Sequence, residues 1–199
     1  TVYATQGQIV MVPDYIGKTS MGGDGGRIHP YMVSEASAMV GWDGLRAGLS
    51  VLSNEGIAAH HDGRVVLWGA SQGGHAIYAV ERYAPYYAPE FELVAAVTLI
   101  APGDLLSQTE DAFLEYGTTA RGVLISLITL GDWYGLWPRI SEVIRDDDAF
   151  PIASWLRAEM EEVCYPELED LGVDSLDDLF TPDFLAAVIT GDWTGFEDW

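Results

Sequence analysis

The sequence predicts an α/β fold, in which a parallel β-sheet with flanking helices is followed by a helical cap. Continuous apolar runs in residues 1–100 alternate with segments of helical spacing, a pattern typical of parallel strands buried on both faces. Residues 101–199 have helical spacing and no convincing strand pattern. With 199 residues, 49% of them hydrophobic, the chain can form one core with a substantial insertion. We therefore expect a core segment at 1–104 and a cap segment at 105–199.

The first predicted elements of the core are a strand and a long helix. Residues 8–12 form an apolar run stopped by Pro13 and are predicted to be a buried strand. Residues 16–30 are rich in glycine and are predicted to be a loop. Apolar residues then recur at helical spacing over 32–54, with Gly56 as the stop signal.

Two more strands and a helix complete the predicted core. Residues 65–69 and 93–100 are apolar runs that suit buried strands. Between them, residues 72–84 can form a helix, which we expect to end at the Ala84-Pro85 pair.

The predicted cap is helical. Residues 116–130 and 148–164 have helical spacing. Thr181 and Pro182 form a helix start, with threonine as N-cap and proline at the first helical position, and the helix is predicted over 183–189.

Charge excludes some classes of partner. The net charge is −22, and residues 101–199 carry 22 acidic and 4 basic residues. Such a chain is a poor partner for nucleic acid or an anionic membrane surface. The longest apolar runs, at 93–100 and 123–130, fall short of the roughly 20 residues of a transmembrane helix. The acidic run 146–148 could bind a cation, but consecutive side chains of a helix point in different directions and no partner at ligand spacing follows. A solvated loop is therefore expected.

The strongest chemical signal is the sequence Gly-Ala-Ser-Gln-Gly at 69–73, which is followed by Gly74. It lies between a predicted strand and a predicted helix, the context of a nucleophile elbow. There Ser71 would occupy a tight, strained turn, and positions 69 and 73 would have to lack bulky side chains. The Gln72 N–H, at the helix N-terminus, would point toward a developing oxyanion. The alternative is a glycine-rich turn with a chance serine.

Four segments, in order, resemble the secretory lipase family of α/β-hydrolases. They are Asp14-Tyr15-x-Gly17, Trp42-Asp43-Gly44-Leu45-Arg46-Ala47, the elbow with His75-Ala76, and Tyr83-Ala84-Pro85 with Ala88-Pro89-Glu90. The first two segments point to this family, whereas the elbow is shared by the whole superfamily. The resemblance covers about residues 5–105, and Pro102-Gly103-Asp104-Leu105 resembles the point where such enzymes enter a helical cap.

The resemblance implies hydrolysis of carboxylic esters through an acyl-enzyme on Ser71. The backbone N–H of Gln72 would be one half of the oxyanion hole, and the cap would shape the acyl pocket. This chemistry requires a nucleophile, a base, an orienting acid and oxyanion donors, so we expect no metal and no organic cofactor. The expected partners are a small-molecule ester or lipid substrate and the remainder of the same polypeptide or a complementary chain. The acidity of the chain, with Lys18 as its sole lysine, favours a secreted or periplasmic protein.

The histidines depart from the order of the superfamily, in which the triad acid and His follow the serine. The chain has four histidines, none well downstream of Ser71: His29, His60, His61 and His75. We expect His60 and His61 to be solvated and His29 to be structural. The triad acid and His are therefore expected outside residues 1–199, so that the chain resembles the middle of a larger hydrolase and is inactive alone.

Two residues inside the chain are alternatives for the missing groups. His75 lies four residues after Ser71 and would need its ring to turn back over the elbow; a packing or hydrogen-bonding role is favoured. Asp104 follows the third predicted strand, where some α/β-hydrolases place the triad acid, although in the family resembled here this position begins the cap. Asp14 also follows a predicted strand, and a turn-capping role is favoured for it.

Two further questions stay open at this point. Cys164, the only cysteine, excludes an internal disulfide; it is either a free buried thiol or, as the resemblance implies, bonded to a cysteine outside the chain. The alternative functions are another acyl-transfer hydrolase (peptidase, thioesterase or acyltransferase) on the same elbow, or a non-catalytic binding module of the same fold.

Overall fold

A computed structural model describes five stretches of the chain, residues 2–18, 27–113, 118–147, 151–162 and 173–199. Their contacts form two compact units. The units comprise Thr1–Gly22 with Ser34–Gly103, and Gly23–Val33 with Asp104–Trp199. The described part of Gly23–Val33 packs with the later helices: Ile28 belongs to their core, and the Thr129 hydroxyl donates to the carbonyl of Tyr31 at 2.7 Å.

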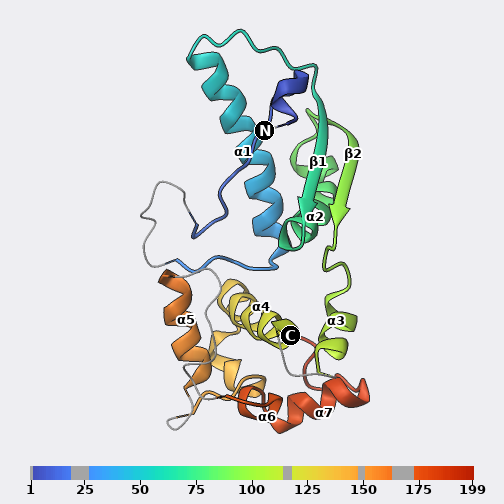
Figure 1. The fold of residues 1–199 in the computed structure, drawn as a ribbon. Helices are drawn as coiled ribbons and strands as arrows, with labels where there is room; N and C mark the ends of the chain where they lie inside the picture. The colour runs from blue at the N-terminus through green and yellow to red at the C-terminus, as the bar shows by residue number, and fades with distance from the viewer. Residues whose placement is uncertain (1, 19–26, 114–117, 148–150, 163–172) are drawn as a thin grey trace. The chain divides into compact units, whose positions relative to one another are not determined.

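The first unit contains a two-stranded parallel sheet and two long helices (Figure 1). Its elements are η1 (Ala4–Gln6), α1 (Ser34–Asn54), β1 (Arg64–Ala70), α2 (Gln72–Tyr87) and β2 (Glu92–Leu99). The two strands are in parallel register from the Arg64–Glu92 pair to the Ala70–Leu99 pair, with one irregularity between Val65 and Val66. The predicted strand–helix–strand order is confirmed, and both strands end at the same edge of the sheet.

Helix α1 confirms the predicted helix, although it begins two residues later, at Ser34. Its end is a Schellman motif, in which Gly56 donates to Ser53 O at 3.2 Å and Ile57 to Leu52 O at 3.0 Å. Gly56 has φ +67°, which glycine adopts without steric cost.

Helix α2 continues to Tyr87, so the prediction that it ends at the Ala84-Pro85 pair is wrong. Proline at 85 removes one backbone donor from the last turn. The turn is closed instead by Ala88, whose N–H donates to Ala84 O at 3.0 Å. Both alanines are buried in the core between the helices and the sheet, which favours the extra turn.

Residues 8–12 form no strand in the described part of the chain, so this prediction is also wrong. The segment packs through its side chains on glycines of α1. A Cβ atom at Gly48 would come within 2.5 Å of Met11 Cε, and one at Gly44 within 2.6 Å of Pro13 Cβ. An apolar run becomes a strand where its backbone finds a ladder partner. Here the bare helix face at Gly44 and Gly48 accommodates the run instead.

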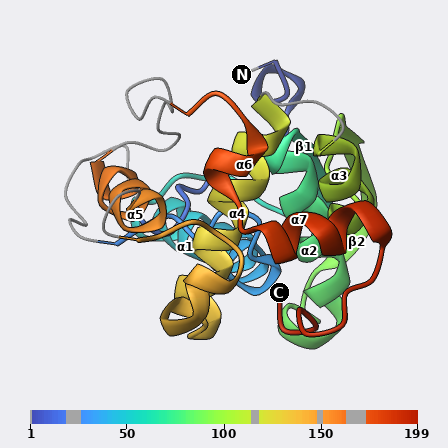
Figure 2. The same ribbon diagram turned by 90° about the horizontal axis from the view of Figure 1, so that it is seen from below.

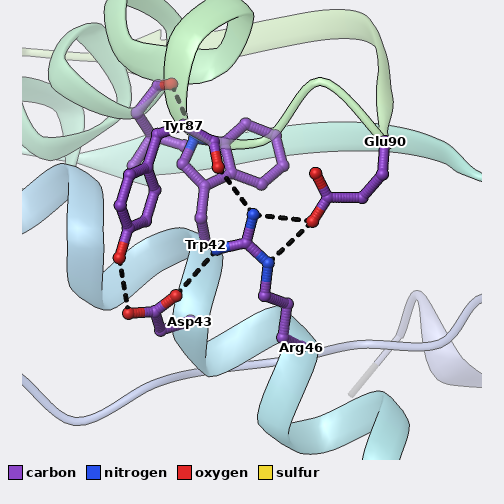
Figure 3. Close-up of polar contacts among 6 residues, drawn as sticks. Trp42, Asp43, Arg46, Tyr87 and Glu90 are labelled. Atoms are coloured by element: carbon purple, nitrogen blue, oxygen red, sulfur yellow. Dashed lines mark hydrogen bonds and ion pairs between the residues drawn. The ribbon is translucent and has the colours of Figure 1, made fainter.

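A polar cluster around Arg46 fastens α1 to the turn between α2 and β2 (Figure 3). The guanidinium donates to Glu90 Oε1 at 2.7 Å, to Asp43 Oδ1 at 2.8 Å and to the carbonyl of Tyr87 at 2.6 Å. The Tyr87 hydroxyl donates to the other oxygen of Asp43 at 2.8 Å, which raises the pKa of Tyr87. Trp42, 1% exposed, donates from its indole to Val80 O at 2.9 Å. The segment around Trp42 and Arg46 thus holds two helices together.

The two faces of the sheet differ in exposure. Val65 and Leu67 pack against the core that Trp42 and Val80 form. On the opposite face, Trp68 is 53% exposed, and Val97, its partner across the strands, is 41% exposed. The strands were predicted to be buried on both faces, and for the described residues this is wrong, because α1 and α2 pack with the Val65 and Leu67 side.

The second unit is helical, and Figure 2 shows its last two helices, α6 and α7, following one another along the chain. Its elements are α3 (Leu105–Ala112), α4 (Thr118–Tyr134), η2 (Trp137–Glu142), α5 (Ile152–Glu162), α6 (Leu176–Leu179) and α7 (Pro182–Thr190). They enclose an apolar core, within which Leu124, Leu156 and Phe180 are fully buried.

The helices predicted for the second half of the chain are confirmed where the structure describes them. Helix α4 starts at Thr118 and runs to Tyr134, four residues beyond the predicted end. The predicted helix at 148–164 is described over Ile152–Glu162, and its remaining residues at either end lie outside the described residues or form a bridge at Pro151. Thr181 caps α7 as predicted, since its hydroxyl accepts from the Phe184 N–H at 3.3 Å.

Candidate active site

Ser71 lies at the turn from β1 into α2, in the strained conformation predicted for it. Its backbone has φ +53° and ψ −124°, and the residue is exposed. A conformation of this kind costs about 1–3 kcal/mol and persists where the surroundings hold it. Two backbone hydrogen bonds do so: the Ser71 N–H donates to Leu99 O at 2.9 Å, and the His75 N–H donates to Ser71 O at 3.1 Å. The hydroxyl accepts no N-cap bond from α2.

Glycines around the turn from β1 into α2 allow β1, α2 and the segment after β2 to approach closely. A Cβ atom at Gly69 would collide with the backbone of Gly73 and lie 2.8 Å from Ile77 Cγ1. A Cβ at Gly74 would lie 2.5 Å from the Cβ of Ala101, in the segment that follows β2. At Gly73 itself, a Cβ would meet nothing within 4 Å among the described residues. The predicted steric requirement therefore holds at 69 but not at 73, and Gly74 carries the second close approach.

Gln72 is the first residue of the 16-residue helix α2, so its N–H belongs to the first turn. First-turn N–H groups have no carbonyl partner within their own helix, and the helix dipole favours negative charge there. The first turn contains no acidic residue. A negative charge developing beside Ser71 would therefore meet no opposing carboxylate from this turn.

Ile100, just after β2, has an unusual backbone that the sequence did not indicate. Its φ is +45°, and its side chain is 87% exposed. Positive φ is a strong outlier for a β-branched residue. Leu99, whose carbonyl accepts from Ser71, directly precedes it. The ends of both strands are thus strained, and a backbone hydrogen bond joins them.

His75 is buried, with 8% of its surface exposed. Its Nδ1 lies 3.1 Å from the carbonyl oxygen of Pro102. A carbonyl only accepts, so this bond requires the proton on Nδ1. Nε2 is buried and has no hydrogen-bond partner among the described residues, the Ser71 hydroxyl included. The geometry is that of a hydrogen-bonding residue, and it does not bring a ring nitrogen within hydrogen-bonding distance of the Ser71 hydroxyl.

The other predicted site residues have local roles. Asp104 belongs to the second unit, where its carboxylate caps α3 by accepting from the Ser107 N–H at 3.1 Å and the Ser107 hydroxyl at 3.0 Å. These bonds hold the pKa of Asp104 below its usual range. His60 and His61 are exposed, as expected, and the buried His29 belongs to the second unit.

The remaining predictions concern Asp14, the acidic run and Cys164. Asp14 is exposed and precedes a turn in which Lys18 donates to Tyr15 O at 2.9 Å. Asp146 accepts from the backbone and hydroxyl of Ser154 at 3.0 and 2.9 Å. Among the described residues, no three His, Cys, Asp or Glu side chains are grouped to hold a metal ion. Cys164 and Asp148 lie outside the described residues.

Comparison with known proteins adds to this geometry. A family model for secretory lipases matches residues 2–116. No curated protein matches the chain. A protein from Legionella pneumophila subsp. pneumophila, assigned as a hydrolase, superposes with a TM-score of 0.72 at 21% identity, over 94% of this chain and 49% of that chain.

An esterase is also similar in structure. The rice cell wall degrading esterase LipA from Xanthomonas oryzae superposes with a TM-score of 0.60 at 25% identity, over 83% of this chain and 45% of that chain. A ligand-bound form of the same esterase superposes with a TM-score of 0.61 at 25% identity, over 86% of this chain and 46% of that chain. The chain therefore spans about half the length of the solved structures it matches. The parallel strands with flanking helices are those of the α/β-hydrolase type, as predicted.

None of the described helices combines the length and the apolar character that crossing a bilayer requires.

Proposed function

Because this chain belongs to the secretory lipase family, we propose that it is the nucleophile-bearing part of a serine carboxylic-ester hydrolase, with Ser71 as the nucleophile. The observation that carries this proposal is the backbone of Ser71. A serine at φ +53° between a parallel strand and a helix has the conformation that a nucleophile elbow needs. The esterase among the similar structures supports the same class of reaction.

The proposed reaction proceeds through an acyl-enzyme. The Ser71 hydroxyl oxygen attacks the ester carbonyl carbon, and a general base takes the hydroxyl proton. The carbonyl oxygen becomes an oxyanion, which accepts a hydrogen bond from the Gln72 N–H in the first turn of α2. The intermediate collapses as the alcohol leaves with a proton, and water then hydrolyses the acyl-serine by the same steps. The chemistry needs protein groups alone.

The base and its orienting acid are proposed to lie outside residues 1–199. In the described residues, neither ring nitrogen of His75 contacts the Ser71 hydroxyl, and the carboxylate of Asp104 is bonded to Ser107. The exposed apolar face at Trp68 and Val97 supports a further part of the fold, from the same polypeptide or a complementary chain. That part would supply the base and cover the sheet.

The substrate would be a small-molecule ester or a lipid. Secretion, or export to a periplasm, accords with the name of the family and with the acidic composition.

Ester hydrolysis by the intact protein tests this function. The rates for p-nitrophenyl esters of increasing acyl length would be measured for the wild type, for Ser71→Ala and for Ser53→Ala. Ser53 is an exposed serine on α1 and serves as the matched control. We expect hydrolysis to fall to background in Ser71→Ala alone.

Two results would contradict the proposal. Hydrolysis that survives Ser71→Ala would exclude this serine as the nucleophile. If the wild type turned over peptide or thioester substrates and hydrolysed no ester, the reaction would be assigned to another class of acyl transfer.

A further inference from the structure

We infer that His75 is a positioning residue for Ser71, which acts through the backbone that follows β2. The inference rests on the proposed role of Ser71 as nucleophile. It concerns what holds the elbow in its strained conformation, and it begins from the two outliers at the ends of β1 and β2, Ser71 and Ile100.

The first step is the bond between the two strand ends. The Ser71 N–H donates to Leu99 O at 2.9 Å. The direction of a carbonyl is set by the peptide plane it shares with the next residue, here Ile100. The orientation of the Leu99 carbonyl therefore depends on Ile100 staying at φ +45°. If Ile100 relaxes to negative φ, the peptide rotates and the bond to Ser71 is lost.

The second step is what holds Ile100. Its own side chain is 87% exposed, so packing of that side chain contributes little. The two residues that follow Ile100 are held by contacts with the first turns of α2. Ala101 lies where a side chain on Gly74 would be, and Pro102 O accepts from His75 Nδ1 at 3.1 Å. The second contact is a specific, part-buried hydrogen bond from a side chain, and so it can be tested by substitution.

The third step closes the path. His75 is one helical turn beyond Ser71, and its backbone N–H donates to Ser71 O. The same residue therefore bonds Ser71 directly through its backbone and indirectly through Pro102, Ile100 and Leu99. Strained residues persist when surrounding structure over-determines them, and this closed path does so for both outliers.

Histidine is suited to this task by the position of Nδ1, two bonds from Cβ. The Asn side-chain nitrogen lies at the same distance from Cβ and can donate to the same carbonyl. The Gln nitrogen lies one bond further out, at the distance of Nε2. Asn at position 75 should therefore preserve the bond, and Gln should not. If His75 acted instead as the base through Nε2, both substitutions would abolish activity.

The experiment measures the rate at which a fluorophosphonate labels Ser71 in the intact protein, with four variants. They are His75→Ala, His75→Asn, His75→Gln and the double variant His75→Ala/Ile100→Gly, with His60→Ala as a control at an exposed histidine. We expect His75→Ala and His75→Gln to label about 10- to 100-fold more slowly than the wild type, the range expected when a reacting atom is misplaced by about 1 Å. His75→Asn and His60→Ala should label at the wild-type rate.

The double variant tests the path itself. Glycine adopts positive φ without steric cost, so Ile100→Gly should restore much of the rate lost in His75→Ala. A structural loss of stability alone would not be rescued by adding a glycine. Amide hydrogen exchange of segment 69–76 gives a second measurement, independent of activity. It should be faster in His75→Ala and His75→Gln and slow in His75→Asn.

The outcomes separate this inference from the proposed function. If the wild type is not labelled at Ser71, the proposed function fails, and hydrogen exchange still decides the role of His75. If the wild type is labelled and His75→Ala is labelled equally fast, with unchanged exchange, the positioning role is wrong. If His75→Asn is not labelled at Ser71 while its amide hydrogen exchange matches that of the wild type, the His75 ring would be assigned to proton transfer. This result would also overturn the inference.

Discussion

The backbone N–H of Ser71 donates to the carbonyl of Leu99 at 2.9 Å, which ties the turn after β1 to the end of β2. In a parallel sheet the carboxyl ends of neighbouring strands meet at one edge, so residues about 30 positions apart become partners there. This bond places the exposed serine hydroxyl at that edge, above the start of α2. The fold thereby brings Ser71 together with the N–H groups of a helix N-terminus.

Substitution by alanine at Gly69 and at Gly73, on the two sides of Ser71, should have different effects on stability. Gly69→Ala puts a methyl group into the backbone of Gly73 and close to Ile77, so β1 and α2 must move apart. We expect it to destabilise the fold by about 1–3 kcal/mol and to slow labelling of Ser71. Gly73→Ala meets open space and favours the helix, so it should be no less stable than the wild type. Thermal unfolding of both variants measures the difference, and equal effects would contradict the assigned packing.

Asp104 is predicted to act as a helix cap and not as the triad acid. Asp104→Asn keeps one oxygen that can accept from the Ser107 N–H, so α3 should form normally. Ester hydrolysis should stay within about threefold of the wild type, whereas converting a triad Asp to Asn lowers kcat by about 10⁴. Steady-state kinetics of this variant, beside Asp111→Asn as a control on the same helix, decides between the two roles. A loss of three or four orders of magnitude confined to position 104 would make it the acid.

The cap of α7 gives a stability prediction for the second unit. The Thr181 hydroxyl accepts from the Phe184 N–H at 3.3 Å and donates to Glu142 O at 2.7 Å. Thr181→Ala removes both bonds and should lower the free energy of unfolding by about 1 kcal/mol. Thr181→Ser, which keeps the hydroxyl, should lose much less. Chemical denaturation followed by far-UV circular dichroism measures both, and equal losses would show that the hydroxyl contributes little.

Acid should weaken the start of α6. The Ser175 hydroxyl and the Asp174 N–H hold the pKa of Asp178 below its usual range. A carboxyl group whose folded pKa is lowered stabilises the fold above its unfolded pKa, near 3.9, and loses this contribution as pH falls through the folded value. Asp178→Asn should therefore lower Tm at pH 7, and the difference from the wild type should shrink progressively as pH falls below about 3.9.

The control for that prediction is Asp177→Asn, which removes the same charge from the same short helix. It separates the effect of the hydrogen bonds of Asp178 from the effect of net charge in this acidic chain. A fall in Tm at pH 7 of the same size in both variants would assign the change to charge alone.

Much of the fold could be predicted because it depends on local patterns. The two strands follow from continuous apolar runs, and the tight turn at Ser71 follows from glycine spacing between a strand and a helix. The end of α1 at Gly56 and the cap at Thr181 follow from residues with well-defined local preferences. The strained backbone of Ser71 was expected for the same reason, because the motif requires it.

The errors concern features that depend on tertiary partners. The composition of residues 8–12 predicts a strand, but the side chains of this segment pack against glycines of α1 instead. Pro85 predicts the end of a helix. It removes only one backbone hydrogen-bond donor near the end of α2, and the helix continues to Tyr87. The positive φ of Ile100 could not be predicted, because nothing in an isoleucine indicates it. The hydrogen bond from His75 to Pro102 could not be predicted either, because the two residues are 27 positions apart.

The most direct test of the central claim is labelling of the intact protein with a fluorophosphonate, followed by peptide mass spectrometry. The reagent reacts with serines activated by a base, so it reports the state of the hydroxyl itself rather than the choice of substrate. We predict one adduct, on the peptide that contains Ser71, and none after Ser71→Ala. An unlabelled Ser71 in folded protein, or an adduct on another serine that persists in Ser71→Ala, would contradict the assignment of this residue as the nucleophile.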